Sequence, residues 1–135
     1  MAKQYDVAVV GATGAVGETM ISILEKRKFP VRNLYPLAST RSAGTRVQFG
    51  GRSVMVLDLA EFDFSKTQIG LFSAGASVSA EYAPKAGQAG CIVIDNTSQF
   101  RYDADVPLVI PEINRHAIAQ CKTRNIIANP NCSTI

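Results

Sequence analysis

The sequence predicts a single α/β domain built on a doubly wound, mostly parallel sheet. Short apolar runs alternate with helical stretches along the 135 residues, a glycine-rich loop follows the first run, and polar segments recur where later runs end. Alternating strands and helices are typical of a parallel sheet with helices on both faces. A chain of this length is expected to form one domain with a sizeable core.

The first part of the chain is expected to fold as a strand–helix–strand unit. Residues 5–10 read as a short buried strand, and residues 15–28 as an amphipathic helix that Phe29-Pro30 terminates. Four apolar side chains are expected on the buried face of this helix, namely Val16, Met20, Ile23 and Leu24. Residues 33–38 read as the second strand, which Pro36 weakens or places at an edge of the sheet.

The rest of the chain continues the alternation. The Gly50-Gly51 pair predicts a turn between two strands of a hairpin, residues 47–49 and 53–57. Further strands are expected at residues 69–72, 91–94, 108–110 and 126–128. Helices are expected at residues 78–89, despite Pro84, and at residues 113–123.

Composition and charge exclude several classes of function. The net charge is +3 and the basic residues are scattered, whereas a nucleic-acid surface needs a dense basic stripe. No apolar run is long enough to span a membrane, and the N-terminus has no signal-peptide core, so a cytoplasmic location is expected. The three cysteines lack CxxC spacing, which argues against a disulfide framework and a metal site.

Polar residues follow five of the expected strands at the point where each strand ends. These segments are residues 11–17, 39–42, 73–75, 95–101 and 129–134. Because ligands of open parallel sheets bind outside the carboxyl ends of the strands, the five segments are expected to share one site.

The glycine loop Gly11-Ala-Thr-Gly14-Ala-Val-Gly17 lies between the first strand and the first helix. Glycines at this spacing permit a tight turn, close approach to a pyrophosphate and close helix packing, while the amides of the helix N-terminus hold the anion. The loop therefore predicts a Rossmann-like nucleotide site, and the alternative is a simple packing turn.

The segment after the second strand favours NADP over NAD. An NAD site usually has an acidic residue there, whereas this sequence has Ser39-Thr40-Arg41-Ser42. A guanidinium flanked by hydroxyls suits a 2′-phosphate. The alternative is a solvated loop arginine.

Cys132 is the candidate nucleophile. It follows the Asn129-Pro130-Asn131 turn at the expected start of a helix, where the thiol pKa is lowered and backbone amides, with Asn131, can stabilise an oxyanion. The alternative is a buried structural cysteine.

The remaining cysteines and the one histidine are not expected to react. Cys91 is expected in the core, Cys121 near a helix end as an inert residue, and His116 at the surface. The thiol of Cys132 is therefore left without an acid–base partner in this sequence.

The segment after the strand at residues 91–94 offers groups for a substrate. Asn96, Thr97 and Ser98 can bond a substrate or a cofactor amide, and Arg101 can hold a phosphate or carboxylate. The alternative is an Asx-turn with a solvated arginine.

Six motifs in collinear order now resemble the bacterial aspartate-semialdehyde dehydrogenases across essentially the whole chain. They are GATGAVG (11–17), ASTRSAG (38–44), LFSAG (71–75), DNTSQFR (95–101), VPLVIPEIN (106–114) and NPNCSTI (129–135). The related N-acetyl-glutamyl-phosphate reductases share the architecture but differ around the cysteine, so NPNCST favours the aspartate enzymes.

The resemblance implies NADPH-dependent reductive dephosphorylation of aspartyl 4-phosphate to aspartate 4-semialdehyde, on the route to lysine, methionine, threonine and diaminopimelate. It implies that Cys132 attacks the acyl phosphate, that inorganic phosphate leaves and that the thioester accepts a hydride. Arg101 matches the phosphate-binding arginine, and Asn131 matches the asparagine before the nucleophile. The matched cofactor positions are Thr13, Gly14, Ala15, Val16, Ser39, Arg41, Ser42, Ser73, Ala74 and Gly75.

The resemblance also implies parts that this sequence lacks. Residues 1–135 are expected to be the NADP-binding domain, ending as the helix after Cys132 begins. A second domain would supply the histidine, a glutamine, the residues for the substrate carboxylate and the interface of a homodimer. The alternatives are a module that binds NADP without catalysis, a related acyl-phosphate reductase, and a scaffold that lost its activity, which the presence of Cys132 and Arg101 disfavours.

Overall fold

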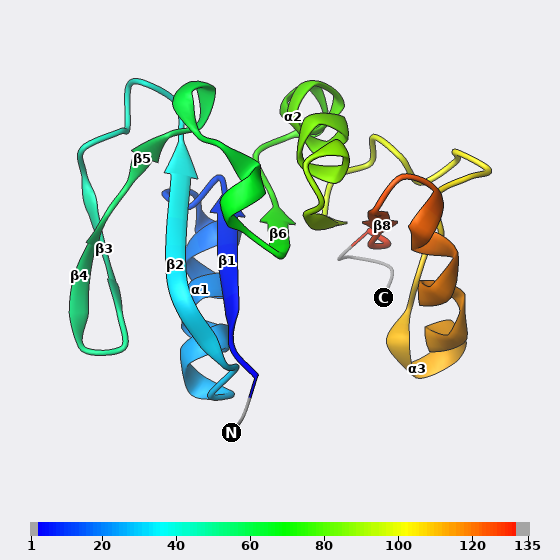
Figure 1. The fold of residues 1–135 in the computed structure, drawn as a ribbon, viewed down its shortest axis with the longest axis horizontal. Helices are drawn as coiled ribbons and strands as arrows, with labels where there is room; N and C mark the ends of the chain where they lie inside the picture. The colour runs from blue at the N-terminus through cyan, green and yellow to red at the C-terminus, as the bar shows by residue number, and fades with distance from the viewer. Residues whose placement is uncertain (1–2, 132–135) are drawn as a thin grey trace.

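The computed structural model describes residues 3–131 and contains a six-stranded sheet in the order β5-β2-β1-β6-β7-β8 (Figure 1). Every pairing in this sheet is parallel. The strands are β1 (Tyr5–Val10), β2 (Val31–Ala38), β5 (Leu57–Asp58), β6 (Ile69–Phe72), β7 (Ile92–Asp95) and β8 (Ile126–Ala128). β2 and β5 lie on one side of β1, and β6, β7 and β8 lie on the other, so the predicted doubly wound α/β fold is confirmed.

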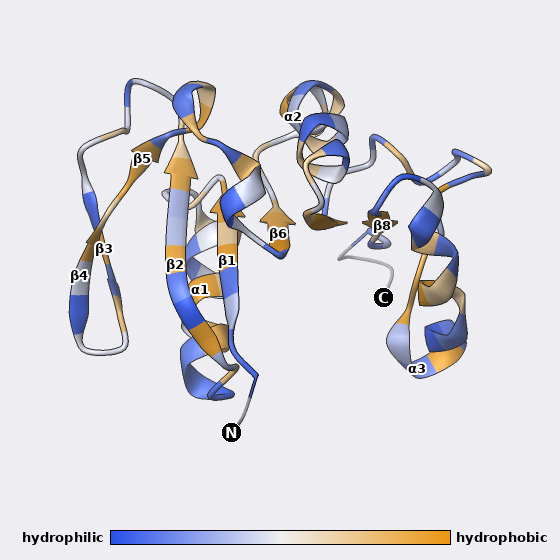
Figure 2. Cartoon of the chain, in the orientation of Figure 1, coloured by the Kyte–Doolittle hydropathy of each residue, from blue (hydrophilic) through white to orange (hydrophobic). Residues whose placement is uncertain are grey.

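Helices cover both faces of the sheet. Successive side chains of β1 point to opposite faces, so alternate residues of this strand pack against different helices. Val9 packs with Ile21 of α1 (Ala15–Lys26), whereas Ala8 and Val10 belong to the cluster that contains Ala83 of α2 (Ala76–Gln88). Figure 2 shows β6 as hydrophobic and α2 as a mixture of hydrophobic and hydrophilic residues, as expected for a buried strand beneath a surface helix. Two short 3₁₀ helices, η1 (Leu59–Glu61) and η2 (Phe64–Lys66), join β5 to β6.

The predicted hairpin forms a separate two-stranded sheet. β3 (Arg46–Phe49) pairs antiparallel with β4 (Arg52–Met55), and the Gly50-Gly51 turn has φ values of 59° and 76°. Positive φ at both turn residues requires glycine or a similarly tolerant residue, which confirms the turn prediction. Val47 and Phe49 pack against the cluster on the α1 face of the main sheet.

The buried face of α1 differs from the predicted one. Met20 and Leu24 pack against the core as expected, but Val16 and Ile23 are each 45% exposed. The inward positions are instead Gly17, Met20, Ile21 and Leu24, spaced three or four residues apart. The predicted buried face was therefore displaced around the helix by part of a turn. The prediction did not count Gly17, which has no side chain and lets the helix approach the sheet.

Pro36 does not place β2 at the edge, since β2 lies between β1 and β5. Leu37 O accepts a hydrogen bond from Gly11 N at 2.9 Å, so Leu37 faces β1 and the nitrogen of Pro36 faces the β5 side. There β5 pairs only with Leu37 and Ala38. The proline therefore removes no ladder hydrogen bond, and the strand forms despite it.

The segment before β8 is less regular than predicted. In place of a strand at residues 108–110 there is one bridge between Leu108 and Ala128. The side chain of Asn114 accepts from Ile110 N at 2.7 Å and donates to Leu108 O at 2.9 Å, so it satisfies the backbone groups that a strand partner would. The predicted helix over residues 113–123 is one α-helical turn, α3 (Pro111–Asn114), followed by the 3₁₀ helix η3 (Arg115–Thr123), which packs Ala117 and Cys121 onto β8.

No helix among the described residues is long and apolar enough to cross a membrane. Residues 3–131 also contain no cluster of three or more histidine, cysteine, aspartate or glutamate side chains that could hold a metal ion.

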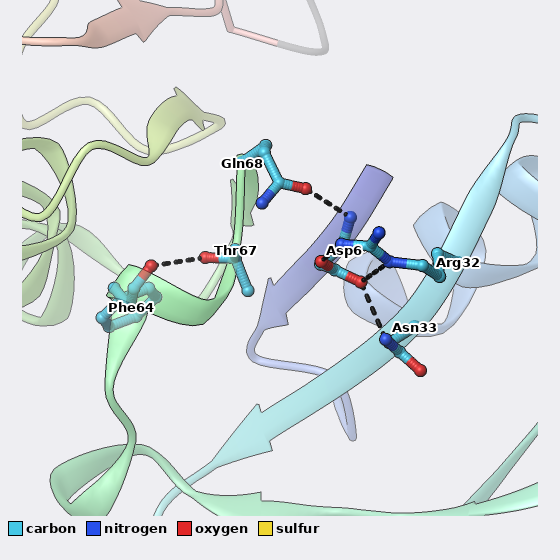
Figure 3. A network of polar contacts seen from close by, with 6 residues as sticks. All are labelled: Asp6, Arg32, Asn33, Phe64, Thr67 and Gln68. Carbon is cyan, nitrogen blue, oxygen red and sulfur yellow. Dashed lines mark hydrogen bonds and ion pairs between the residues drawn. The ribbon is translucent and has the colours of Figure 1, made fainter. Parts of the chain in front are cut away.

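A buried carboxylate ties the amino ends of β1, β2 and β6 together, at the opposite end of the strands from the polar loops (Figure 3). Asp6 accepts from Arg32 through both oxygens, with Nε at 3.0 Å, and from Asn33 Nδ2 at 2.8 Å. Gln68 accepts from the Asp6 backbone amide at 2.8 Å. The hydrogen bond from Arg32 is the main cause that lowers the pKa of Asp6 from 3.8 to about 2, against the opposing effect of burial.

We expect this carboxylate to stabilise the fold above pH 4 and to lose that contribution as the pH falls from about 4 to 2. The unfolded chain binds the proton more tightly than the folded one, so acid favours unfolding. The Arg32 side chain is 56% exposed, and solvent screening keeps the loss between pH 5 and pH 3 below about 1 kcal/mol. Urea unfolding at both pH values should show this loss in the wild type and a smaller one in Asp6→Asn, and parallel behaviour of the two proteins would contradict the assignment.

Candidate nucleotide-binding site

A cleft of about 410 Å³ opens at the carboxyl ends of β1, β2, β5 and β6. Its walls come from the glycine loop, the turn after β2, the start of η1 and the first turns of α2. The lining residues are Gly11, Thr13, Ala38, Ser39, Thr40, Ser42, Asp58, Leu59, Ala60, Ala74, Val78 and Tyr82. Segments that are far apart in the sequence therefore meet at one edge, and three of the five polar segments expected to share a site contribute to this cleft, namely residues 11–17, 39–42 and 73–75.

The glycine loop is fixed by backbone contacts that leave no room for a side chain at Gly17. Leu37 O accepts from the amides of Gly11 and Ala12 at 2.9 and 3.1 Å, and Gly11 has a φ of 88°. A Cβ on Gly17 would lie 2.0 Å from Gly11 O, whereas one on Gly14 would lie 3.5 Å from the same atom. Gly17 therefore allows α1 to start directly against the loop.

The first turn of α1 faces this loop with backbone N–H groups outside the helical hydrogen-bond ladder. Gly14 is the N-cap residue, and Glu18 N makes the first helical hydrogen bond, to Gly14 O at 2.9 Å. The N–H groups of residues 15–17 precede that bond, as at any helix N-terminus. Thr13, Ala15 and Val16 are exposed, so an anion can reach these amides.

The turn after β2 brings three hydroxyls to the opposite side of the cleft. Ser39 O accepts from Ser42 N at 2.9 Å, which closes the turn. Ser39, Thr40 and Ser42 line the cleft, while Arg41 is exposed in the same turn and does not line it.

Sequence reasoning missed an acid at this position. No acidic residue follows β2 in the sequence, but β5 pairs with β2 in parallel and places Asp58 beside Ala38. Asp58 Oδ2 accepts from Thr40 Oγ1 at 2.7 Å, and Oδ1 accepts from Ala60 N at 3.0 Å, where Asp58 caps η1. Both carboxylate oxygens are therefore engaged within the protein. The pairing of a two-residue strand carries too little sequence signal to reveal this neighbour.

The third loop of the cleft, residues 73–75, rests on the glycine loop. Ser73 N and Oγ both donate to Val10 O, at 3.0 and 3.2 Å. A Cβ on Gly11 would approach Ala74 Cβ to 3.1 Å. Gly75 has a φ of 100° and precedes the first residue of α2. The three residues thus place the α2 N-terminus next to that of α1.

The segment after β7 forms the Asx-turn that was one of the two alternatives. Asp95 is fully buried, and its Oδ1 accepts from Thr97 N at 3.0 Å while its Oδ2 accepts from Thr97 Oγ1 at 2.8 Å. Ser79 Oγ of α2 donates to Asp95 Oδ1 at 2.8 Å. The loop is therefore anchored in the core at its first residue.

The Asx-turn was predicted together with a solvated arginine, but Arg101 is not solvated in this way. It is half-buried, donating from Nε to Asn129 O at 2.8 Å and from Nη2 to Asn96 O at 3.1 Å. Asn129 Nδ2 donates to Asn96 Oδ1 at 2.9 Å. The structure thus brings the loops after β7 and β8 together around the guanidinium.

The predicted nucleophile lies outside the described residues, as do residues 133–135. Asn131, the last residue described, is exposed. Cys91 is fully buried as predicted, and this burial raises the pKa of its thiol although a hydrogen bond from Thr67 opposes the shift. Cys121 is buried and His116 is exposed, in agreement with their predicted structural roles.

The doubly wound sheet, the glycine loop at the first strand–helix junction and the adjoining cleft define a dinucleotide-binding domain. Residues 6–121 match the family described as semialdehyde dehydrogenase, NAD binding domain, and the chain belongs to that family. It corresponds to the N-terminal NAD(P)-binding part of aspartate-semialdehyde dehydrogenases.

Two curated relatives illustrate the sequence similarity. The chain is 64% identical over 135 residues to the aspartate-semialdehyde dehydrogenase of Shewanella violacea and 59% identical to that of Legionella pneumophila. Each match covers 100% of this chain but only 40% and 39% of the relative. The chain thus spans about 40% of the length of the curated relatives it matches.

Two solved structures show the same fold. Aspartate-semialdehyde dehydrogenase II of Vibrio cholerae, complexed with ASA, superposes with a TM-score of 0.97 at 59% identity, over 98% of this chain and 44% of that one. The enzyme of Candida albicans, solved with NADP, superposes with a TM-score of 0.79 at 25% identity, over 98% and 44% of the two chains.

Proposed function

We propose that this chain is the NADP-binding portion of an aspartate-semialdehyde dehydrogenase. Such an enzyme reduces L-aspartyl 4-phosphate to L-aspartate 4-semialdehyde with NADPH and releases inorganic phosphate. The observation that carries the proposal is the cleft that the glycine loop shares with the Ser39–Ser42 turn, with the Arg101 loop following β7 at the same end of the sheet, in a chain 64% identical to an enzyme of that name. We further propose a cytoplasmic homodimer, as the resemblance implies.

The residues of the cleft fit a dinucleotide. The glycine loop lies so close to α1 that a Cβ on Gly17 would clash with Gly11 O, and the amides at the start of α1 beside this loop can hold a pyrophosphate. When bound, NADPH supplies the hydride for the reduction. Gly14, Thr13, Ala15 and Val16 would approach the pyrophosphate, and Ser73, Ala74 and Gly75 would approach the rest of the cofactor.

The turn after β2 supports NADP over NAD. Asp58, which pairs with Ala38 at the end of β2, ties this turn to η1, because its two oxygens accept from Thr40 Oγ1 and Ala60 N. The turn offers Ser39, Ser42 and the guanidinium of Arg41 to a 2′-phosphate. Asp58 would therefore act by holding this turn in place.

The substrate side of the proposal rests on Arg101 and Cys132. The Cys132 thiolate would attack the acyl carbon, forming a carbon–sulfur bond while the carbon–oxygen bond to phosphate breaks. Arg101 and Asn96 would hold the departing phosphate, and Asn131 would donate to the developing oxyanion. Hydride addition to the thioester, followed by loss of the thiolate, gives the aldehyde and restores the cysteine.

We expect Arg41→Glu to weaken NADP binding by at least about tenfold and NAD binding by less than about twofold. The substitution replaces the proposed partner of the 2′-phosphate with a like charge, and NAD lacks that phosphate. Isothermal titration of the chain with both cofactors measures the two affinities. Arg46→Glu, an exposed arginine of the hairpin that bonds Ser53, is the matched control for a change of net charge. An equal loss for both cofactors would remove the argument for NADP.

The activity itself is tested in the complete native polypeptide by supplying aspartate 4-semialdehyde, inorganic phosphate and NADP, and following NADPH absorbance. Turnover that requires phosphate supports the proposal. Cofactor binding without turnover would instead favour the second candidate, a module that binds NADP and catalyses nothing. Turnover with N-acetyl-glutamate semialdehyde in place of the aspartate compound would assign the chain to the related reductases.

A further inference from the structure

Two backbone carbonyls hold the guanidinium of Arg101 in one orientation. Nε donates to Asn129 O at 2.8 Å and Nη2 donates to Asn96 O at 3.1 Å. Nε and Nη2 form one edge of the planar group, so its side-on fork is used within the protein. The edge formed by Nη1 and the second hydrogen of Nη2 makes no hydrogen bond within residues 3–131 and is left for an anion.

Asn129 connects the two loops that supply these carbonyls. Its backbone amide donates to Asp95 O at 2.9 Å, and its Nδ2 donates to Asn96 Oδ1 at 2.9 Å. Pro130 follows it and is buried, which restricts the backbone of Asn129 to extended conformations. Asn129 therefore supplies one of the two carbonyls that accept from Arg101, and its side chain holds Asn96, which supplies the other.

The partner loop is rigid enough for this connection to matter. Asp95 is fully buried and accepts hydrogen bonds from Ser79 Oγ of α2 and from the hydroxyl and amide of Thr97. Asn96 therefore follows a residue that is anchored in the core, and its side chain is bonded to Asn129.

We propose that Asn129 is a positioning residue for anion binding, which sets the Arg101 guanidinium so that its end-on edge meets a phosphate group. That this phosphate belongs to the acyl-phosphate substrate or to its leaving group rests on the proposed function. The geometry further assigns Oδ1 of Asn96 to holding Asn129 and the carbonyl of Asn96 to holding Arg101.

The test uses Asn129→Ala in the complete native polypeptide, with inorganic phosphate as the probe. The variant keeps the carbonyl that accepts from Arg101 but removes the link to Asn96. We expect phosphate affinity to fall about tenfold and NADP affinity to change less than about twofold. The ¹⁵N–¹H signal of Arg101 Nε, assigned by its absence in Arg101→Lys, should broaden as the guanidinium gains freedom. Asn129→Asp should weaken phosphate further, because a carboxylate there competes for the guanidinium.

Asn114→Ala is the matched control, because Asn114 also joins two backbone groups through its side chain and does not contact Arg101. Its phosphate affinity should match that of the wild type, even if its melting temperature falls as much as that of Asn129→Ala. Unchanged phosphate affinity in Asn129→Ala, or an equal loss in Asn114→Ala, overturns the proposal. Absence of phosphate binding through Arg101 in the wild type also overturns it, whether or not the protein turns over the semialdehyde. Phosphate binding through Arg101 without turnover would refute the proposed function alone.

Discussion

Replacing Cys132 with alanine in the complete native polypeptide is expected to lower kcat by about 10⁴-fold or more and to leave NADP affinity unchanged. The thiolate is the group that forms a covalent bond to the substrate in the proposed reaction, so its removal blocks the first step. Steady-state turnover with aspartate 4-semialdehyde, phosphate and NADP measures the loss, and isothermal titration measures cofactor binding.

Cys121→Ala is the appropriate control for the loss of a thiol. Cys121 belongs to η3 and is buried against Ile127 of β8 rather than placed in a polar loop, so its replacement should cost stability through a small cavity but retain turnover. Turnover retained in Cys132→Ala would refute the role of Cys132 as nucleophile, while loss of turnover in both variants would point to a general effect of removing thiols.

The fold was predictable because strong local signals agreed with one another. The apolar runs at residues 5–10 and 69–72 and the Gly50-Gly51 turn each specify an element without reference to the rest of the chain. The parallel arrangement then places the described polar loops at the carboxyl ends of the strands, which is where the sequence predicted a site.

The partners of the site residues could not be predicted in the same way. Asp58 reaches the end of β2 through a two-residue strand, and Arg101 bonds to a carbonyl 28 residues away. Such contacts join segments that are distant in the sequence, and the pattern within one segment does not show which distant segment lies beside it. Asn129 was read only as part of a turn for the same reason. Local sequence therefore proposed Arg101 as a candidate but missed Asp58, and the tertiary structure shows which atoms of each are already bonded within the protein.

Gly17→Ala is expected to destabilise the chain by about 3 kcal/mol or more and to abolish measurable cofactor binding. The new Cβ would lie 2.0 Å from Gly11 O, 2.8 Å from Gly11 C and 2.9 Å from Ala12 Cα. All three neighbours are backbone atoms, and the amides of Gly11 and Ala12 are bonded to Leu37 O, so the loop cannot yield without breaking the contact between β1 and β2.

Gly14→Ala separates this effect from the general cost of replacing a loop glycine. Its φ of −83° is accessible to alanine, and its nearest neighbour, Gly11 O, would be in ordinary contact at 3.5 Å, so a loss of only about 0.5 kcal/mol is expected at this N-cap position. Urea unfolding of the two variants and titration with NADP make the comparison. Equal stability of the two variants would mean that α1 can move away from the loop. The close approach of helix and loop would then not be what fixes the pyrophosphate site.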